Sequence, residues 1–203
     1  MNTIFYIHGW RSTPHKKVKE IQAHYEKEKV VGIALTYRLE DDIKTLKAHI
    51  NPLLGNGDNV IVCGSSMGGF MTLALMQEYP TMPFRIAFVP VNPALDVLIR
   101  MDEFLGQTIE SYDGTITTTI DQTCRNQAIT VQSRVRNFSP DDLASVSYHT
   151  LIGTEDEVLT YDLYRELYTD NHVTYIKSGH RLEDLKPLYK LIDGFMSSFA
   201  PAN

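Results

Sequence analysis

The chain has 203 residues, 43% of them hydrophobic and 22% charged, and it carries a formal net charge of −6 at pH 7. This composition excludes a disordered or fibrous chain, and the length fits one domain with a sizeable hydrophobic core. The negative charge argues against a nucleic-acid partner. The apolar runs are much shorter than the roughly 20 residues of a membrane span, so we expect no membrane partner.

The two cysteines and the N-terminal segment bear on the cellular compartment. Cys63 lies within an apolar run, so we expect a buried thiol and no structural disulfide with Cys124. The N-terminal segment, MNTIFYIHGW, has neither the basic region nor the cleavage site of a secretory signal. Both observations predict a cytoplasmic protein.

Strand-like and helix-like segments alternate along the chain. Continuous apolar or β-rich runs predict strands at 3–8, 30–37, 60–63, 84–91, 146–152 and 172–176. Helical spacing of apolar residues predicts helices at about 16–29, 41–54, 70–79, 161–168 and 185–199. This order is typical of parallel βαβ units. It predicts an α/β fold of three layers, in which helices cover both faces of a mostly parallel, six-stranded sheet.

One long segment, 92–143, interrupts the alternation. It contains a predicted helix at 94–105 and a threonine-rich, β-like stretch at 115–120, and it is far longer than an ordinary connection. Open parallel sheets bind ligands at the carboxyl ends of their strands. We therefore interpret 94–143 as a lid or cap inserted into a single domain of residues 1–203. A purely structural decoration is the alternative.

A serine in a glycine-rich turn is the most informative feature of the sequence. The apolar run VIVC leads into GSSMG at 64–68, a G-x-S-x-G sequence, and a helical run follows. Strand, tight turn and helix in this order are typical of a nucleophile elbow with Ser66 as the nucleophile. Gly64 and Gly68 give the turn the room that it needs. The N–H of Met67, at the start of the helix, is predicted to bind an oxyanion. In the alternative interpretation, Ser66 only caps the helix.

A serine nucleophile needs a histidine base, and in this fold the histidine comes last in chain order. Of the histidines that follow Ser66, His149 lies within a predicted strand and His172 begins one. His180 alone follows a strand, in the loop KSGHR, where Gly179 allows a sharp turn. We therefore predict that His180 is the base.

The acid that orients the histidine is expected in the loop after the preceding strand. That loop reads GTEDEV at 153–158 and contains three consecutive carboxylates. Asp156 is the preferred acid, because a short side chain at the apex of the loop suits the reach to a histidine Nδ1–H. Glu155 and Glu157 remain alternatives in the same loop, and Asp96 is a more distant one, one strand earlier.

The loop after the first strand is expected to supply the second oxyanion donor. Gly9 allows the backbone to turn there, and the N–H of Trp10 is the predicted donor. The Trp10 ring also predicts an aromatic wall beside the site. Together with Phe104, Leu105 and Tyr112 from the inserted segment, it suggests an apolar substrate-binding pocket, although core packing explains such residues equally well.

Five segments together resemble a known family. IFYIHGW with STP shortly after it, IVCGSSMGGF, VPVNPAL, GTEDEVLTY and SGH resemble the YqiA-type small bacterial esterases of the α/β-hydrolase superfamily, from Ile4 to about 199. The resemblance implies a compact hydrolase that lacks the first two strands of the full fold. It implies Ser66 as nucleophile, Asp156 as acid and His180 as base. It also implies activity on short-chain acyl esters without a metal or cofactor.

These features predict a serine esterase that cleaves a small-molecule ester through an acyl-enzyme intermediate. Because a catalytic triad does not select the leaving group, a thioesterase or peptidase with the same residues is an alternative. A catalytically silent binding module of the same fold is a second alternative, since fold alone does not define function.

Overall fold

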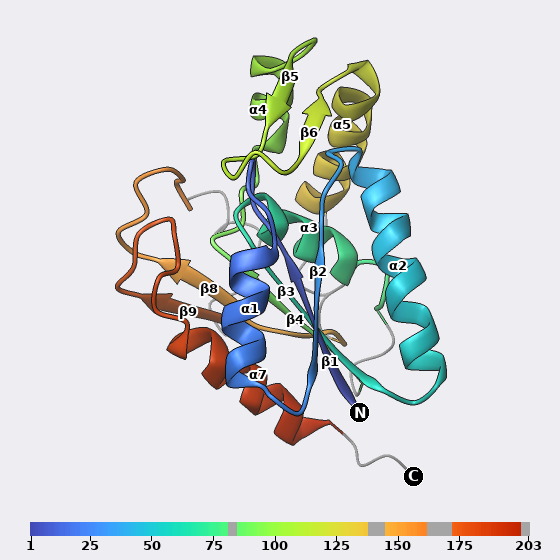
Figure 1. Ribbon diagram of the computed structural model, residues 1–203, viewed down its shortest axis with the longest axis vertical. Coiled ribbons are helices and arrows are strands. Elements are labelled where there is room, and N and C mark those ends of the chain that lie inside the picture. Colours follow the sequence, from blue (N-terminus) through green and yellow to red (C-terminus); the bar gives the residue numbers. More distant parts are fainter. Residues whose placement is uncertain (81–84, 138–144, 162–171, 200–203) are drawn as a thin grey trace.

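The computed structural model of the protein describes residues 1–80, 85–137, 145–161 and 172–199. Its centre is a seven-stranded sheet in the order β2-β1-β3-β4-β8-β9, with β7 pairing with β4 beside this path. Every pairing that the structure describes within this sheet is parallel. Helices lie on both faces of the sheet (Figure 1). The predicted three-layer, mostly parallel α/β fold is thus confirmed.

The strands fall within or close to the predicted segments. They are β1 (Asn2–Ile7), β2 (Lys29–Ile33), β3 (Asn59–Ser65), β4 (Ile86–Val91), β7 (Ser147–Tyr148), β8 (Thr150–Gly153) and β9 (Val173–Ile176). The strand predicted at 146–152 is two pieces that meet at His149, which is why the sheet has seven strands and not six. Strand β2 ends earlier than predicted, and the chain that follows it reaches a positive φ of 64° at Tyr37.

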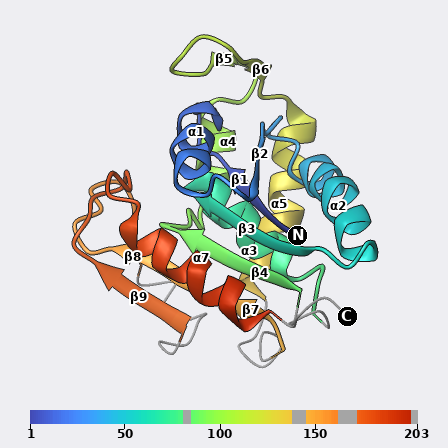
Figure 2. The same cartoon turned by 60° about the horizontal axis from the view of Figure 1, so that its bottom comes forward.

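Side chains of the central strands alternate between two buried faces. One face packs against α1 (His15–His24) and α7 (Lys186–Ser198), and the other against α2 (Leu39–Gly55), α3 (Met67–Met76) and α5 (Gln122–Arg136) (Figures 1 and 2). Along β1, for example, Ile4 belongs to the first cluster and Phe5 to the second. Burial on both faces explains why these strands read as continuous apolar runs.

Several smaller sequence expectations can be compared with the structure. Cys63 is buried and forms no disulfide with Cys124, as predicted, and Cys124 is buried as well. Helix α1 ends five residues before the predicted boundary of 29, at His24, because the chain turns there to enter β2. The helix predicted at 161–168 lies outside the described residues except at Tyr161. Among the described residues, none of the helices combines the length and the apolar character that crossing a membrane requires.

The described residues of the inserted segment form two parts with different positions. Helix α4 (Val97–Glu103) and a hairpin of β5 (Thr108–Glu110) and β6 (Thr117–Thr119) lie beyond the carboxyl ends of the central strands (Figure 1). Helix α5, which the sequence analysis did not predict, instead packs against α2 and α3 in the helical layer on one face of the sheet. Only the first part therefore lies where it can contact a ligand at the strand ends.

Candidate active site

Ser66 stands at the turn between β3 and α3. Its φ is 57° and its ψ is −119°, a conformation that a residue with a side chain adopts only under strain. Hydrogen bonds hold this backbone: Ser66 N donates to Val91 O at 2.9 Å, and Ser66 O accepts from the N–H groups of Phe70 and Ala94 at 3.0 and 3.1 Å. The Ser66 side chain makes no capping bond to α3, so the interpretation of Ser66 as a helix cap is wrong.

Two glycines make this turn possible. A Cβ atom on Gly64 would lie 2.6 Å from the carbonyl carbon of Gly68. A Cβ atom on Gly68 would lie 2.6 Å from the carbonyl carbon of Ile7 and 2.7 Å from the carbonyl oxygen of His8. Such approaches are far inside van der Waals contact, so β3, α3 and the end of β1 pack this closely only because both residues lack side chains.

Asp156 and His180 form a hydrogen-bonded pair in the loops that follow β8 and β9. His180 Nδ1 lies 2.9 Å from Asp156 Oδ2, and the carboxylate side chain is only 1% exposed. Oδ1 accepts the N–H groups of Val158 and Leu159 at 2.8 and 2.9 Å, and Oδ2 also accepts the hydroxyl of Tyr161 at 2.6 Å. Burial acts to raise the pKa of Asp156, but these hydrogen bonds outweigh it and hold the pKa below its ordinary value. Asp156 is therefore ionised at neutral pH.

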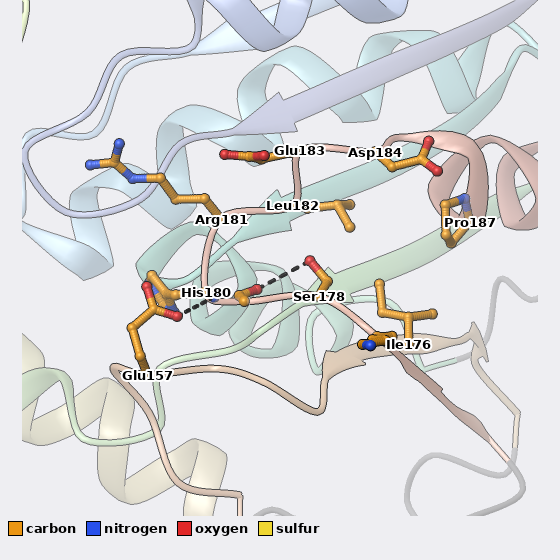
Figure 3. A pocket seen from close by; sticks show the side chains of 11 residues that line it. Glu157, Ile176, Ser178, His180, Arg181, Leu182, Glu183, Asp184 and Pro187 are labelled. Carbon is orange, nitrogen blue, oxygen red and sulfur yellow. Dashed lines mark hydrogen bonds between the residues drawn. The ribbon is translucent and has the colours of Figure 1, made fainter.

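The other carboxylates that the sequence offered have different partners. Glu157 Oε2 accepts the backbone N–H of His180 at 3.0 Å and so orients the histidine loop (Figure 3). Glu155 forms an ion pair on the surface, and Asp96 pairs with Arg136. Of these four carboxylates, Asp156 is the one that contacts the His180 ring.

The two remaining downstream histidines lie elsewhere. His149 Nε2 lies 2.7 Å from the hydroxyl of Thr174, and the His172 ring stacks on Tyr148 at 4.5 Å. Neither residue lines the pocket that Ser66 and His180 share. The structure thus brings Ser66 together with the histidine that the sequence analysis selected.

His8 braces the loop after β1 directly beside the nucleophile. Its ring is 1% exposed, and Nε2 accepts the N–H of Leu35 at 2.9 Å. The ring proton must therefore sit on Nδ1, which donates to Gly9 O at 2.8 Å. Burial lowers the pKa of His8 and keeps this tautomer neutral. A Cβ atom on Gly9 would lie 3.1 Å from Cβ of Ser66, so the braced loop packs against the elbow.

Trp10 and Met67, the two predicted oxyanion donors, both line the pocket at Ser66. The Trp10 ring packs against Tyr37 at 4.7 Å and against Phe104 at 5.6 Å. The next residue, Arg11, has a φ of 51° and donates its N–H to the hydroxyl of Tyr37 at 2.9 Å. Within the described chain, the N–H groups of Trp10 and Met67 have no protein acceptor, which leaves them available to a ligand.

The pocket has a volume of about 1230 Å³, and its lining combines exposed apolar side chains with charged ones. Ile99, Tyr112 and Val158 line it and are 63%, 69% and 50% exposed. Phe104 and Leu105, also predicted to bind substrate, are not among its lining residues. The Phe104 ring instead packs against the Trp10 ring. In the part of the chain that the structure describes, no group of three or more His, Cys, Asp or Glu side chains is arranged to hold a metal ion.

The β5–β6 hairpin is tied to the loop after β1. Tyr112 N donates to Arg11 O at 2.8 Å, and Arg11 Nε donates to Glu110 O at 2.9 Å. Thr13 Oγ1 donates to Asp113 at 2.6 Å. These bonds hold Tyr112 at the mouth of the pocket, beside the predicted oxyanion donor Trp10.

Asn92 is a site residue that the sequence analysis missed. It follows β4, is 1% exposed and has a φ of 43°. Its Oδ1 accepts the N–H of Gly153 at 2.7 Å, and its Nδ2 donates to the carbonyl oxygens of Gly179 and His180 at 3.2 and 3.0 Å. One side chain thus joins the end of β4 to the loops that carry the acid and the histidine. Its position after an apolar strand, in VPVN, is the only signal in the sequence.

We expect Asn92→Ala to destabilise the protein by about 2–4 kcal/mol, because it leaves the buried N–H of Gly153 without a partner and puts alanine at a positive φ. Urea unfolding measures the difference. Asn137→Ala is the matched control, since Asn137 is exposed, has a negative φ and, among the described residues, makes one weak side-chain bond. Equal effects of the two substitutions would contradict the structural role of Asn92.

A second pocket of about 730 Å³ is also lined by the histidine loop. Glu157, Ser178 and His180 line part of it, and Figure 3 shows the backbone of His180 held against Glu157 at its edge. The hydroxyl of Ser178 donates to Gly179 O at 3.2 Å within the same loop. The histidine loop is thus held by Glu157 as well as by Asn92.

Comparisons with solved structures agree on the fold. Est1E from Butyrivibrio proteoclasticus superposes with a TM-score of 0.64 at 13% identity, covering 97% of this chain and 88% of that one. A monoacylglycerol lipase from Paleococcus ferrophilus gives 0.68 at 13% identity, covering 97% and 94%. A structure of the metagenome-derived lipolytic enzymes LipS and LipT gives 0.66 at 17%, covering 97% and 94%. Because the identities are so low, these likenesses show the fold alone, which is an α/β-hydrolase fold.

Comparison at the level of sequence identifies the family. No curated protein sequence matches the chain. The profile of the family described as "Uncharacterised protein family (UPF0227)" matches residues 3–197, nearly the whole chain. This match confirms the resemblance to YqiA-type proteins that the five sequence segments carried, and the chain belongs to the UPF0227 family.

Proposed function

We propose that this protein is a serine hydrolase that cleaves carboxylic esters, with Ser66, His180 and Asp156 as its catalytic triad. One observation carries the proposal: a strained elbow serine shares a pocket with a histidine whose Nδ1 contacts a buried, ionised carboxylate. This arrangement combines a nucleophile, a base and the group that orients the base. No hydrogen bond joins Ser66 Oγ and His180 within the described residues, and such bonds often tighten only when substrate binds.

In the proposed acylation step, Ser66 Oγ attacks the ester carbonyl carbon while His180 Nε2 takes the hydroxyl proton. The carbonyl oxygen becomes negatively charged and accepts hydrogen bonds from the N–H groups of Met67 and Trp10. Asp156 keeps the His180 proton on Nδ1 and stabilises the charged imidazole. When the tetrahedral intermediate collapses, His180 returns its proton to the leaving alcohol, and the acyl group stays on Ser66.

Deacylation follows the same route with water in place of the serine hydroxyl. His180 takes a proton from water as the water oxygen attacks the acyl carbon. The same two N–H groups hold the second oxyanion. His180 then returns the proton to Ser66 Oγ, the acid leaves and the enzyme is regenerated. No step needs a metal or an organic cofactor.

The substrate class that we propose is a small ester with an apolar acyl group. The exposed side chains of Ile99, Tyr112 and Val158 at the mouth support an apolar chain there. Trp10 lines the same pocket as Ser66 and Met67, which supports its predicted role as an aromatic wall. The resemblance to YqiA-type esterases supports short acyl chains, and a cytoplasmic location remains our prediction.

The structural neighbours support ester hydrolysis as the reaction. Those described as lipolytic enzymes and as a monoacylglycerol lipase act on ester bonds, and Est1E has been solved with ferulic acid bound. Their likeness to this chain lies in the fold. The residues at Ser66, Asp156 and His180 are what connect the fold to the proposed activity.

The test is hydrolysis of p-nitrophenyl esters from acetate to decanoate, run with fluorophosphonate labelling of the folded protein. We expect labelling at Ser66 and an optimum among the short esters. Labelling with hydrolysis of thioesters or peptides alone would support the leaving-group alternative. A folded protein that neither reacts with the probe nor hydrolyses any ester would contradict the proposal and favour a silent binding module.

A further inference from the structure

The carboxylate of Asp156 has an unusual set of donors. Two backbone N–H groups occupy Oδ1, and Oδ2 accepts both His180 Nδ1 at 2.9 Å and the Tyr161 hydroxyl at 2.6 Å. The side chain of Asp156 is 1% exposed, so protein groups supply its hydrogen bonds. The oxygen that faces the histidine is thus shared with a phenol.

The shared oxygen has a definite chemical consequence. Burial and the hydrogen-bonded carboxylate of Asp156 raise the pKa of Tyr161, so its hydroxyl stays protonated and donates at neutral pH. A second donor on Oδ2 draws charge away from the atom that must stabilise the charged imidazole. It also fixes the rotation of the carboxylate, because Oδ1 and Oδ2 are each held from two sides.

We propose that Tyr161 is a positioning residue of this site: it orients Oδ2 of Asp156 toward His180 and limits how strongly that oxygen holds the imidazole proton. The inference rests on the proposed function of the Asp156–His180 pair. It predicts that Tyr161 sets the lower end of the pH range in which His180 can act as a base. Without the phenol, the carboxylate would hold the protonated imidazole more firmly.

Other charged groups line the same pocket as His180 and come from several elements. Arg181 and Glu183 belong to its own loop, Glu157 to the acid loop, Asp96 and Arg100 to α4 and its start, and Lys16, Lys17 and Glu20 to α1. Lys17 is paired with Glu20, Asp96 with Arg136 and Arg100 with Glu103. All of them are retained when only the Tyr161 hydroxyl is removed, so a change in titration reports on that hydroxyl.

The test compares Tyr161→Phe with Tyr79→Phe. Tyr79 is a matched control: it is 6% exposed against 9% for Tyr161, and its hydroxyl donates a bond of the same 2.6 Å length, to Asn51, outside the pocket. Two readouts are measured across pH: kcat/KM for a short p-nitrophenyl ester, and the NMR titration of the His180 ring, assigned by its loss in His180→Asn.

We expect Tyr161→Phe to move the acid limb of the kcat/KM profile, and the NMR midpoint of His180, to higher pH by about 0.5–1 unit. Tyr79→Phe should leave the acid limb and the NMR midpoint at the same pH as in the unchanged protein. 3-Fluorotyrosine in place of Tyr161 keeps the ring and donates more strongly, so it should move both readouts slightly to lower pH. The fluorotyrosine variant therefore tests the inference even if Tyr161→Phe folds poorly.

The outcomes separate this inference from the proposed function. An unchanged profile and midpoint in Tyr161→Phe, with only the plateau rate lowered, would make Tyr161 a packing residue and overturn the inference. If the unchanged protein hydrolyses no ester, the proposed function fails, while the NMR midpoint still decides whether Tyr161 acts on His180 through Asp156.

Discussion

Replacing Ser66 with alanine is expected to lower kcat/KM for p-nitrophenyl acetate by about 10⁴-fold or more, to the background rate. The substitution removes the only atom that forms the acyl bond in the proposed mechanism, and water has no equally oriented place from which to attack. Alanine keeps the Cβ atom of Ser66, so the strained backbone at a φ of 57° is neither relieved nor worsened. The melting temperature should therefore change little, and the loss would be one of chemistry.

The adjacent serine provides the matched control. Ser65 ends β3, and its hydroxyl forms a 2.8 Å hydrogen bond with Tyr6. We expect Ser65→Ala to retain most of the activity and Ser66→Ala to lose it together with fluorophosphonate labelling. The reverse pattern, or full activity in both variants, would be incompatible with Ser66 as the nucleophile.

Chain order and loop position were enough to predict that Asp156 contacts His180 and that His180 lines the same pocket as Ser66. Ser66 follows one strand, and Asp156 and His180 follow two others. The carboxyl ends of neighbouring parallel strands lie at one edge, so their loops converge there. The choice of Asp156 from three consecutive carboxylates rested on side-chain length, and the structure has this residue at 2.9 Å from the imidazole.

Other parts of the site depend on contacts that no local pattern encodes. Asn92 acts on residues that are 61 to 88 positions away along the chain, so nothing beside it in the sequence indicates its role. Tyr161 is close to Asp156 in sequence, but its importance lies in the direction of one hydroxyl.

Helix α5 was not predicted from the sequence for a different reason. Its buried positions include Cys124, Ala128 and Gln132 beside Val131 and Val135, so its apolar stripe is weak in the sequence. Packing against α2, α3 and α4 stabilises it in the fold. Without a helix at α5, the sequence predicts that the whole of 94–143 lies over the pocket. Among the described elements of this segment, α4 and the β5–β6 hairpin lie beyond the strand ends.

A methyl group at the second glycine of the elbow should be among the most damaging small changes to this protein. We expect Gly68→Ala to destabilise it by about 3 kcal/mol or more, or to prevent folding. The new Cβ atom would lie 2.6 Å from the carbonyl carbon of Ile7 and 2.7 Å from the carbonyl oxygen of His8, and closer still to the carbonyl oxygen of Ile7. These are backbone atoms of β1 and the loop after it, so no side-chain rotation relieves the clash.

Gly194→Ala tests whether the clash, and not the loss of a glycine, is responsible. Gly194 also lies in a helix, α7, but a Cβ atom there would meet nothing within 4 Å. Because alanine is the better helix former, we expect Gly194→Ala to stabilise the protein by about 0.5–1 kcal/mol. Chemical denaturation of the two variants beside the unchanged protein measures both effects. If Gly68→Ala proved as harmless as Gly194→Ala, α3 would not pack against β1 as closely as the structure has it. The close approach of Ser66 to Gly9 in the loop after β1, which depends on that packing, would then lose its support.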